Sequence, residues 1–238
     1  IVKHVSRRVK EGMSTREIYK ITFRLLKKEK HSLASRYDLK HAIMRLGPAG
    51  FPFETYLGEI LREQGHSIQL RQMLQGKCVE HEIDVVLNGD TLVECKYHNM
   101  PGIYTGLKPA MYTYARFLDL RNNTGEKESG EFKGVWLATN TKFSSDAIEY
   151  AECIGITLLG WRHPKENSLE QMIESRGLYP ITILQSIDSS TKDCFSNAGM
   201  MLIKDLTELN PTTIKAKTGV SNNKLSRIIQ EAREILKN

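Results

Sequence analysis

Long apolar runs are missing from this sequence of 238 residues, which argues against a protein that crosses a membrane. No stretch approaches the roughly 20 apolar residues that span a bilayer as a helix. Residues 1–4 also lack the apolar core of a signal peptide. We therefore expect a cytoplasmic protein with no membrane partner. Because the first residue is not Met, we also expect the chain to be part of a longer protein.

Paired cysteines are missing as well. The four cysteines stand far apart, with no Cys-x-x-Cys pair: Cys78, Cys95, Cys153 and Cys194. The seven histidines show no metal-ligand spacing. A disulfide framework and a structural zinc site are therefore excluded as organising features, and reduced thiols are typical of the cytosol.

Charge is plentiful but unevenly distributed. Residues 1–45 carry 13 Lys and Arg against 4 Asp and Glu, residues 46–196 carry 14 against 20, and residues 197–238 carry 7 against 4. Hydrophobic residues make up 40% of the chain, which is typical of a globular protein. An acidic middle between basic flanks predicts a polyanionic partner that the flanks attract. The alternative is that the basic flanks are solvated helical surfaces.

A β-hairpin is predicted for residues 81–96. Asn88-Gly89 is a strong signal for a tight turn, because both positions accept a positive φ. Alternation along the second strand places Glu94 and Lys96 on one face, and Asp84 lies on the first strand. The hairpin is therefore expected to bring two carboxylates together beside an ammonium group.

That combination is suited to phosphodiester hydrolysis. Two carboxylates bind a hard divalent cation through oxygen, and a neighbouring lysine orients or deprotonates a water. The alternative is a solvated strand surface, because the pattern is short and degenerate. Glu82 shares the predicted face of Asp84 and is either an extra ligand or a solvated acid.

The elements around the hairpin follow a recognisable order. A helix is predicted for residues 54–64, a first strand for 66–70, a later helix for 114–120, and further strands for 134–138 and 155–161. A helix over 144–152 is expected to join the last two strands, and residues 122–130 are expected to form a polar loop.

This order resembles the PD-(D/E)xK superfamily of restriction-endonuclease-like proteins, and most closely its Mrr-like branch. The residues that carry the resemblance are Phe53-Glu54, Gly65-His66, Ile83-Asp84 and Glu94-Cys95-Lys96. Ile83 stands where the family name has proline, and this matters little because the aspartate carries the chemistry. The resemblance covers roughly the middle half of the chain, where several spaced features agree.

The resemblance implies a role for each matching residue. Asp84, Glu94 and the backbone carbonyl of Cys95 would bind Mg²⁺, for which Mn²⁺ can substitute. Lys96 would orient the attacking water, and Glu54 would support the metal or its waters. Glu80 and His98 lie close in sequence and receive no role.

The N-terminal flank is predicted to be helical. Residues 1–10 are amphipathic, Ser14 and Glu17 form a capping box for a helix that runs to residue 26, and a third helix covers 32–45. The motifs around Ser14 and Ala34 resemble the later part of an ATP-cone domain. The opening strand that contacts nucleotide in that family is missing, so no nucleotide binding is expected. The flank is a candidate dimerisation or docking element.

The C-terminal flank is predicted to follow a linker at residues 186–193, with helices over 200–209, from Pro211, and over 222–236. The turn at residues 218–221 resembles a helix-hairpin-helix module, which offers backbone N–H groups to a phosphate. The residues expected to contact DNA surround this turn: Lys215, Lys217, Gly219, Ser221, Lys224 and Arg227. The alternative is a small helical bundle that contacts protein.

The expected fold class is α/β, with a restriction-endonuclease-like mixed sheet flanked by small all-α modules. The predicted parts are a helical module at 1–47, a nuclease domain at 48–165, a helical connector and linker at 166–196, and a helix-hairpin-helix-like DNA-binding module at 197–238. The expected function is a Mg²⁺-dependent DNA endonuclease that acts through a metal-bound water, in restriction or repair, with a homodimer as a candidate assembly. The alternative is a non-catalytic DNA-binding or nucleotide-responsive regulator on the same scaffold.

Overall fold

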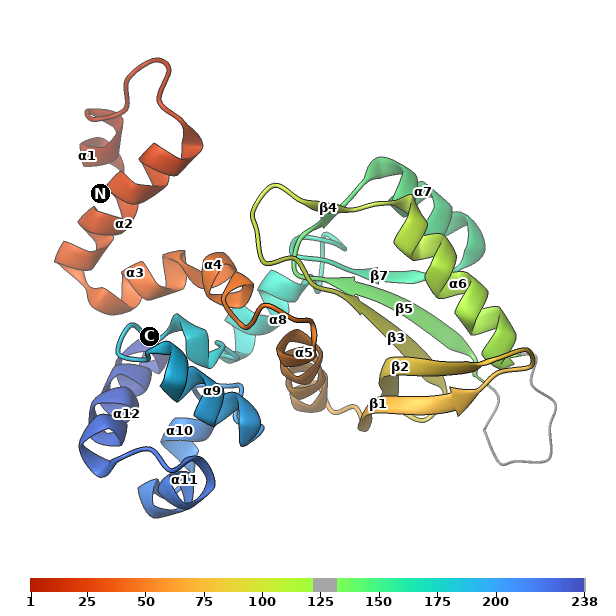
Figure 1. The fold of residues 1–238 in the computed structure, drawn as a ribbon. Coiled ribbons are helices and arrows are strands. Elements are labelled where there is room, and N and C mark those ends of the chain that lie inside the picture. Colours follow the sequence, from red (N-terminus) through yellow and green to blue (C-terminus); the bar gives the residue numbers. More distant parts are fainter. Residues whose placement is uncertain (122–131, 238) are drawn as a thin grey trace. The chain divides into compact units, whose positions relative to one another are not determined.

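The computed structural model describes residues 1–121 and 132–237 (Figure 1). The segment 122–130, which was expected to be a polar loop, lies outside the described residues. The chain forms two compact units, and each is described by itself. The sheet unit contains Met44–Leu178, and the helical unit combines Ile1–Ile43 with Tyr179–Asn238.

The sheet unit contains a five-stranded mixed sheet in the order β1-β2-β3-β5-β7. Its strands are β1 (Ile68–Gln75), β2 (Glu80–Leu87), β3 (Thr91–Lys96), β5 (Gly134–Thr139) and β7 (Thr157–Leu159). The first three strands pair antiparallel, and β3, β5 and β7 pair parallel. A separate parallel pair joins β4 (Tyr104–Thr105) to β6 (Lys142–Phe143). The predicted α/β class with a mixed sheet is confirmed.

The hairpin between β2 and β3 forms at the predicted turn. Asn88 has a φ of 52° and Gly89 a φ of 79°, so both occupy the left-handed region. Leu87 pairs with Thr91 across the turn, and the Asp90 N–H donates to the carbonyl of Leu87 at 3.2 Å. Only glycine and a few residues with short polar side chains accept this backbone readily, which is why the local sequence was informative.

Helices cover the two faces of the sheet. On one face, α6 (Leu107–Arg121) and α7 (Ser145–Ile154) pack over a core that includes Val86, Leu92 and Leu137 (Figure 1). The α5 helix (Phe51–Glu63) packs against β1 and β2. Its Phe53 ring stacks on the Tyr97 ring, with 5.7 Å between the ring centroids. The α8 helix (Leu169–Arg176) follows the last strand. These layers hold β2 and β3 in a fixed position.

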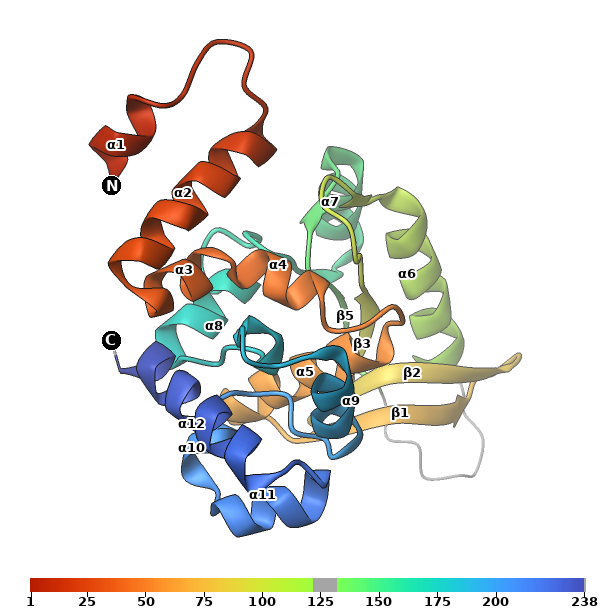
Figure 2. The same ribbon diagram turned by 60° about the vertical axis from the view of Figure 1, so that its left-hand side comes forward.

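The helical unit draws on both ends of the chain. From the N-terminal part come α1 (Val2–Ser6), α2 (Thr15–Glu29), α3 (His31–Tyr37) and α4 (Leu39–Met44), the last of which ends one residue inside the sheet unit. From the C-terminal part come η1 (Ile181–Ile183), α9 (Ser189–Asn197), α10 (Asp205–Glu208), α11 (Pro211–Thr218) and α12 (Asn222–Leu236). Figure 2 shows the short turn that joins α11 to α12.

Hydrogen bonds join the two ends of the chain within the helical unit. Arg36 donates to the carbonyl of Ile235 at 2.7 Å, and the Thr182 hydroxyl donates to the carbonyl of Ala42 at 2.6 Å. The units therefore divide after residues 43 and 178, whereas the sequence placed boundaries after 47, 165 and 196. Residues 166–178 lie in the sheet unit and 179–196 in the helical unit, because Tyr179 and the residues after it are buried there.

Three local predictions for the helical unit need correction. The third helix is interrupted at Asp38, between α3 and α4. Residues 186–193 do not form a simple linker, because Asp188 caps α9 by accepting from the Thr191 N–H at 2.9 Å. The same small polar residues favour both loops and helix caps, so composition did not separate the two.

The third correction concerns residues 200–209, of which only α10 is helical. The backbone before α10 pairs with the segment at Tyr179: Ile181 donates to the carbonyl of Met201, and Ile203 donates to that of Tyr179, both at 2.9 Å. These hydrogen bonds satisfy backbone N–H and C=O groups that a longer helix would have paired internally. The capping box of Ser14 with Glu17 and the bounds of α12 are confirmed. The apolar residues that recur along α12 at helical spacing are all buried: Leu225, Ile228, Ile229, Ala232 and Ile235.

Candidate active site

The candidate site lies where β2 and β3 separate. The two strands pair only from Val85 with Val93 to Leu87 with Thr91. Beyond that point β2 stays paired with β1 as far as Glu80, and β3 stays paired with β5 as far as Lys96. Asp84 and Glu94 are therefore the first residues past the last pair. The fork of the sheet places both predicted ligands at one point.

Asp84 makes a side-chain bond at the position where the ladder stops. Its Oδ2 accepts from the backbone N–H of Cys95 at 2.7 Å. A carboxylate thus replaces the carbonyl that would otherwise have paired with this N–H group. The bond holds Asp84 beside the Glu94–Cys95–Lys96 segment, as the predicted site requires.

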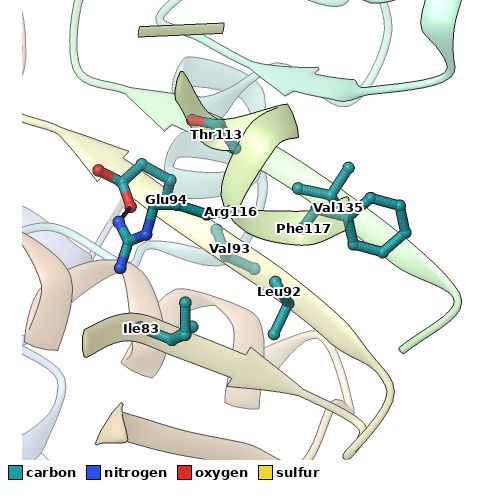
Figure 3. Close-up of a pocket in the computed structure, with 8 residues that line it drawn as sticks. All are labelled: Ile83, Leu92, Val93, Glu94, Thr113, Arg116, Phe117 and Val135. Atoms are coloured by element: carbon teal, nitrogen blue, oxygen red, sulfur yellow. Dashed lines mark hydrogen bonds and ion pairs between the residues drawn. The ribbon is translucent and has the colours of Figure 1, made fainter. Parts of the chain in front are cut away.

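Glu94 is held between two cations. It is 8% exposed, and its Oε1 accepts from Lys96 Nζ at 3.0 Å. Its Oε2 accepts from the guanidinium of Arg116 on α6 (Figure 3). Lys96 and Glu94 meet on one face of β3, as the alternation predicted.

Arg116 is a site residue that the sequence analysis did not identify. Its side chain is 11% exposed, and its guanidinium lies 5.3 Å from the ring centroid of Tyr112. The segment containing Arg116 was recognised only as a helix. The sequence feature that could have identified Arg116 is its place beside the buried stripe of an amphipathic helix, because a charged side chain there requires a partner.

We expect Arg116→Met to destabilise the sheet unit by roughly 2–4 kcal/mol, because it leaves a buried carboxylate with Lys96 as its only cation. Urea unfolding would measure the loss. The double variant Arg116→Met with Glu94→Gln should recover much of it, because the uncompensated charge is then gone. A loss below about 1 kcal/mol in the single variant would show that Arg116 does not stabilise the buried Glu94.

Glu54 approaches the fork from the first turn of α5. It is 6% exposed, and its Oε2 lies 3.7 Å from an Arg71 guanidinium nitrogen, beyond hydrogen-bond distance. Among the residues that the structure describes, this buried oxygen has no hydrogen-bond partner. A buried carboxylate oxygen without a partner is costly, and a bound cation or an ordered water would compensate it.

Burial and mutual repulsion raise the pKa values of two of these acids. Burial raises the pKa of Glu54 to about 7, and the negative charge of Asp84 contributes to the rise. Burial also raises the pKa of Asp84 to about 6, with a further contribution from Glu94. The pKa of the Cys95 thiol lies well above its ordinary range because the thiol is buried beside these acids. A divalent cation would stabilise the ionised carboxylates.

The donor set fits a hard cation. The candidate donors are the carboxylate oxygens of Asp84 and Glu94 and the carbonyl of Cys95. Among the described residues, Oε2 of Glu54 has no hydrogen-bond partner, and the charge of Asp84 contributes to raising the pKa of Glu54. Over residues 1–121 and 132–237, no group of three or more His, Cys, Asp and Glu side chains is placed to hold a metal ion. A two-carboxylate site completed by water and phosphate is consistent with this, because Mg²⁺ keeps several waters in proteins.

The remaining residues near the hairpin differ in their surroundings. Glu80 and Glu82 are exposed, and Glu82 contributes to raising the pKa of Glu54. Asn140 and Thr105 hold His98: the backbone N–H of His98 donates to Asn140 Oδ1 at 2.9 Å, and the ring Nε2 lies 3.0 Å from Thr105 Oγ1. Burial lowers the pKa of His98. His98 thus fixes the backbone just after Lys96.

The predicted DNA-contacting residues gather at the α11–α12 turn. Gly219 has a φ of 70° and ends α11, and Ser221 is the N-cap of α12. Lys215, Lys217 and Arg227 are exposed. Lys224 is engaged, since its Nζ donates to Asp188 Oδ2 at 2.7 Å. A surface hollow at this turn is bounded by Ser186, Ser221, Asn223, Lys224 and Arg227.

Comparison with known proteins places the chain in a family. An uncharacterized protein of Archaeoglobus fulgidus is 42% identical over 183 residues, which are 76% of this chain and 99% of the relative. Residues 179–236 match the model of the AF1548-like C-terminal domain, which begins where the helical unit resumes. This chain belongs to the AF1548-like family.

A solved structure shares the fold of the AF1548-like chain. The crystal structure of the protein of unknown function AF1548 is 40% identical, with a TM-score of 0.69, and the match covers 79% of this chain and 99% of that one. No helix within the described residues is long and apolar enough to cross a membrane.

Proposed function

We propose that this AF1548-like protein is a divalent-cation-dependent endonuclease that hydrolyses phosphodiester bonds in DNA, with a sheet unit of the restriction-endonuclease-like type. The observation that carries the proposal is the fork of β2 and β3. There Asp84 bonds the backbone of Cys95, while Glu94 and Lys96 lie 3.0 Å apart at their charged atoms. Glu54 adds a third acid beside Asp84.

Each residue has a distinct task in this reaction. Asp84, Glu94 and the carbonyl of Cys95 hold Mg²⁺, or Mn²⁺ in its place, and Glu54 supports the site from α5. When bound, the cation supplies charge stabilisation to the phosphoryl oxygens. Lys96 orients the attacking water and steadies the charge on the phosphate. The water oxygen displaces the 3′ oxygen of the neighbouring nucleotide, so a 5′-phosphate and a 3′-hydroxyl remain.

One such site cuts one strand, so cleavage of a duplex calls for two chains and a homodimer. The biological setting that we propose is restriction of foreign DNA or DNA repair inside the cell. Either setting requires the protein to approach a polyanion, although the sheet unit carries 14 Lys and Arg against 18 Asp and Glu. The helical unit carries 20 against 10, and this excess would attract the DNA backbone.

The salt dependence of DNA binding tests the role of the helical unit. We expect the triple variant Lys215→Gln, Lys217→Gln and Arg227→Gln to flatten the slope of log affinity against log salt by about 2–3. Each phosphate contact releases counterions from the DNA when it forms, so a protein with fewer contacts releases fewer counterions. Fluorescence anisotropy titrations at several salt concentrations would measure it.

A matched triple on the sheet unit, with Lys133, Lys142 and Lys165 changed to Gln, removes the same charge and should change the slope less. Equal slopes for the two triples would show that the α11–α12 turn does not touch DNA. Point variants are preferable to removal of residues 197–238, because Leu206, Ile214 and Ile228 in that segment are buried in the helical unit.

A plasmid cleavage assay tests the catalytic proposal most directly. We expect nicked or linear product with Mg²⁺ or Mn²⁺ and none with EDTA, because the carboxylates need a cation to act on a phosphodiester. End-labelling should detect a 5′-phosphate. Binding of DNA without cleavage under every metal condition would contradict the proposal.

A second candidate is a DNA-binding regulator that uses the same scaffold without catalysis. One observation favours it: both carboxylate oxygens of Glu94 are already engaged, by Lys96 and Arg116. A cation would have to share Glu94 with these groups. Calorimetric titration with Mn²⁺ separates the two candidates, since the regulator has no need of a cation at the fork.

A further inference from the structure

Arg71 has an unusual backbone for its residue type. It lies within β1 with a φ of 50°, in the left-handed region. The other described residues besides glycine with a positive φ are Asn88 and Asn167, and asparagine tolerates this region well. A long side chain such as that of arginine pays a steric penalty there, and such strain tends to persist where the side chain has a function.

The strained backbone changes the face that β1 presents. Leu70, just before Arg71, packs close to Gly58 of α5. Leu74, three residues after Arg71, packs against the core beneath α6. A regular strand keeps residues four apart on one face, so the change of face occurs between these two leucines. Arg71 lies opposite Asp84 there, between the pairs Leu70 with Val85 and Gln72 with Ile83.

The Arg71 guanidinium lies beside Glu54 and Thr55 of α5. One Arg71 nitrogen lies 3.2 Å from the Thr55 hydroxyl and 3.7 Å from Glu54 Oε2. The Arg71 side chain is 39% exposed, whereas that of Glu54 is 8% exposed. The guanidinium therefore stands on the solvent side of a buried carboxylate. It donates a hydrogen bond to the Thr55 hydroxyl and pairs with Glu54 by charge, without a hydrogen bond to Glu54 itself.

We propose that Arg71 is a phosphate-binding residue of the site, and that its guanidinium occupies the position beside Glu54 until a divalent cation replaces it and frees it to bind a phosphate oxygen of the DNA. The inference rests on the proposed nuclease function and deepens it. A guanidinium presents paired N–H donors that match phosphate oxygens. Two positive charges competing for Glu54 repel each other, so binding of the cation favours the outward position of Arg71.

The proposal predicts opposite effects on two affinities. Arg71→Gln removes the competing charge, so the affinity of the protein for Ca²⁺ should rise, by roughly threefold to tenfold. The same variant loses a phosphate contact, so its affinity for a short DNA duplex in Ca²⁺ should fall by roughly tenfold. Isothermal titration calorimetry with Ca²⁺ alone measures the first affinity, and anisotropy with labelled duplex in Ca²⁺ measures the second. Arg71→Lys keeps the charge but not the paired donors, and should recover the cation affinity of the wild type more fully than its DNA affinity.

Two variants serve as controls. Arg62→Gln removes a positive charge from the same helix that carries Glu54, where Arg62 pairs with Glu59. It should leave both affinities unchanged. Arg71→Gly relieves the positive φ but removes the guanidinium, so DNA binding should weaken, whereas Asn167→Gly relieves a positive φ in an exposed loop and should leave DNA binding unchanged.

The outcomes separate this inference from the proposed function. Wild-type Ca²⁺ binding that is lost in Asp84→Asn supports the metal site. If Arg71→Gln then shows unchanged or weaker Ca²⁺ affinity, or wild-type DNA affinity, the Arg71 inference fails alone. Wild-type protein that binds neither Ca²⁺ nor Mn²⁺ overturns both proposals, because Arg71 then has no cation to make way for.

Discussion

Replacement of Asp84 by Asn is expected to lower metal-dependent DNA cleavage by at least roughly 100-fold while the sheet unit stays folded. The amide oxygen of Asn can still accept from the Cys95 N–H, so the local bond survives. The negative charge that a hard cation requires is lost. A plasmid assay with Mg²⁺ or Mn²⁺ measures cleavage, and calorimetry with Ca²⁺ measures the accompanying loss of cation affinity.

Stability measurements make the Asp84→Asn result interpretable. Because burial raises the pKa of Asp84, the ionised side chain is unfavourable in the apo protein, and the melting temperature of the variant should equal or exceed that of the wild type. Asp90→Asn is the matched control, since Asp90 lies at the turn of the same hairpin and pairs with Lys133 at 3.8 Å. A folded Asp84→Asn protein that cuts as well as the Asp90→Asn control would refute the active-site assignment.

Replacement of Lys96 by Ala is expected to slow cleavage by roughly 10²–10⁴-fold. The variant removes the ammonium that we propose orients the water, while Asp84 and Glu94 keep their oxygens. Cation affinity should therefore be retained or increased, because Arg116 alone remains on Glu94. Single-turnover cleavage and Ca²⁺ calorimetry on the same preparation separate the loss of turnover from any loss of the metal.

The Lys96 side chain is 36% exposed, so its loss should leave the fold intact. Lys142→Ala is a suitable control, because Lys142 is an exposed lysine on another strand of the sheet unit. Equal cleavage rates for the Lys96→Ala and Lys142→Ala proteins would remove Lys96 from the mechanism. Such a result would favour the regulator.

Local interactions made much of this architecture predictable from sequence. The Asn88-Gly89 turn, the capping box at Ser14 and the inward stripe of α12 depend on residues within a few positions of one another. Alternation along β3 placed Glu94 beside Lys96 for the same reason. The candidate acids could be named because they follow one another on a single predicted hairpin.

Local ambiguity accounts for the predictions that needed correction. Asp188 and its neighbours have the composition of a linker but cap α9, and residues 200–203 pair with a distant segment instead of extending a helix. The joining of the two chain ends in one helical unit depends on contacts between residues such as Arg36 and Ile235. Their separation in the sequence leaves no periodic signal.

The sequence by itself determined the α/β class, the hairpin and the identity of the acids and lysine that it carries. Tertiary structure decided where β2 and β3 separate, and thus how Asp84 meets Cys95. It also brought Arg116 from α6 to Glu94, and Arg71 to Glu54 through a positive φ within β1. The physical reason is that short-range patterns specify turns, caps and faces, whereas the partner of a buried charge is chosen by packing between elements that are far apart in the chain.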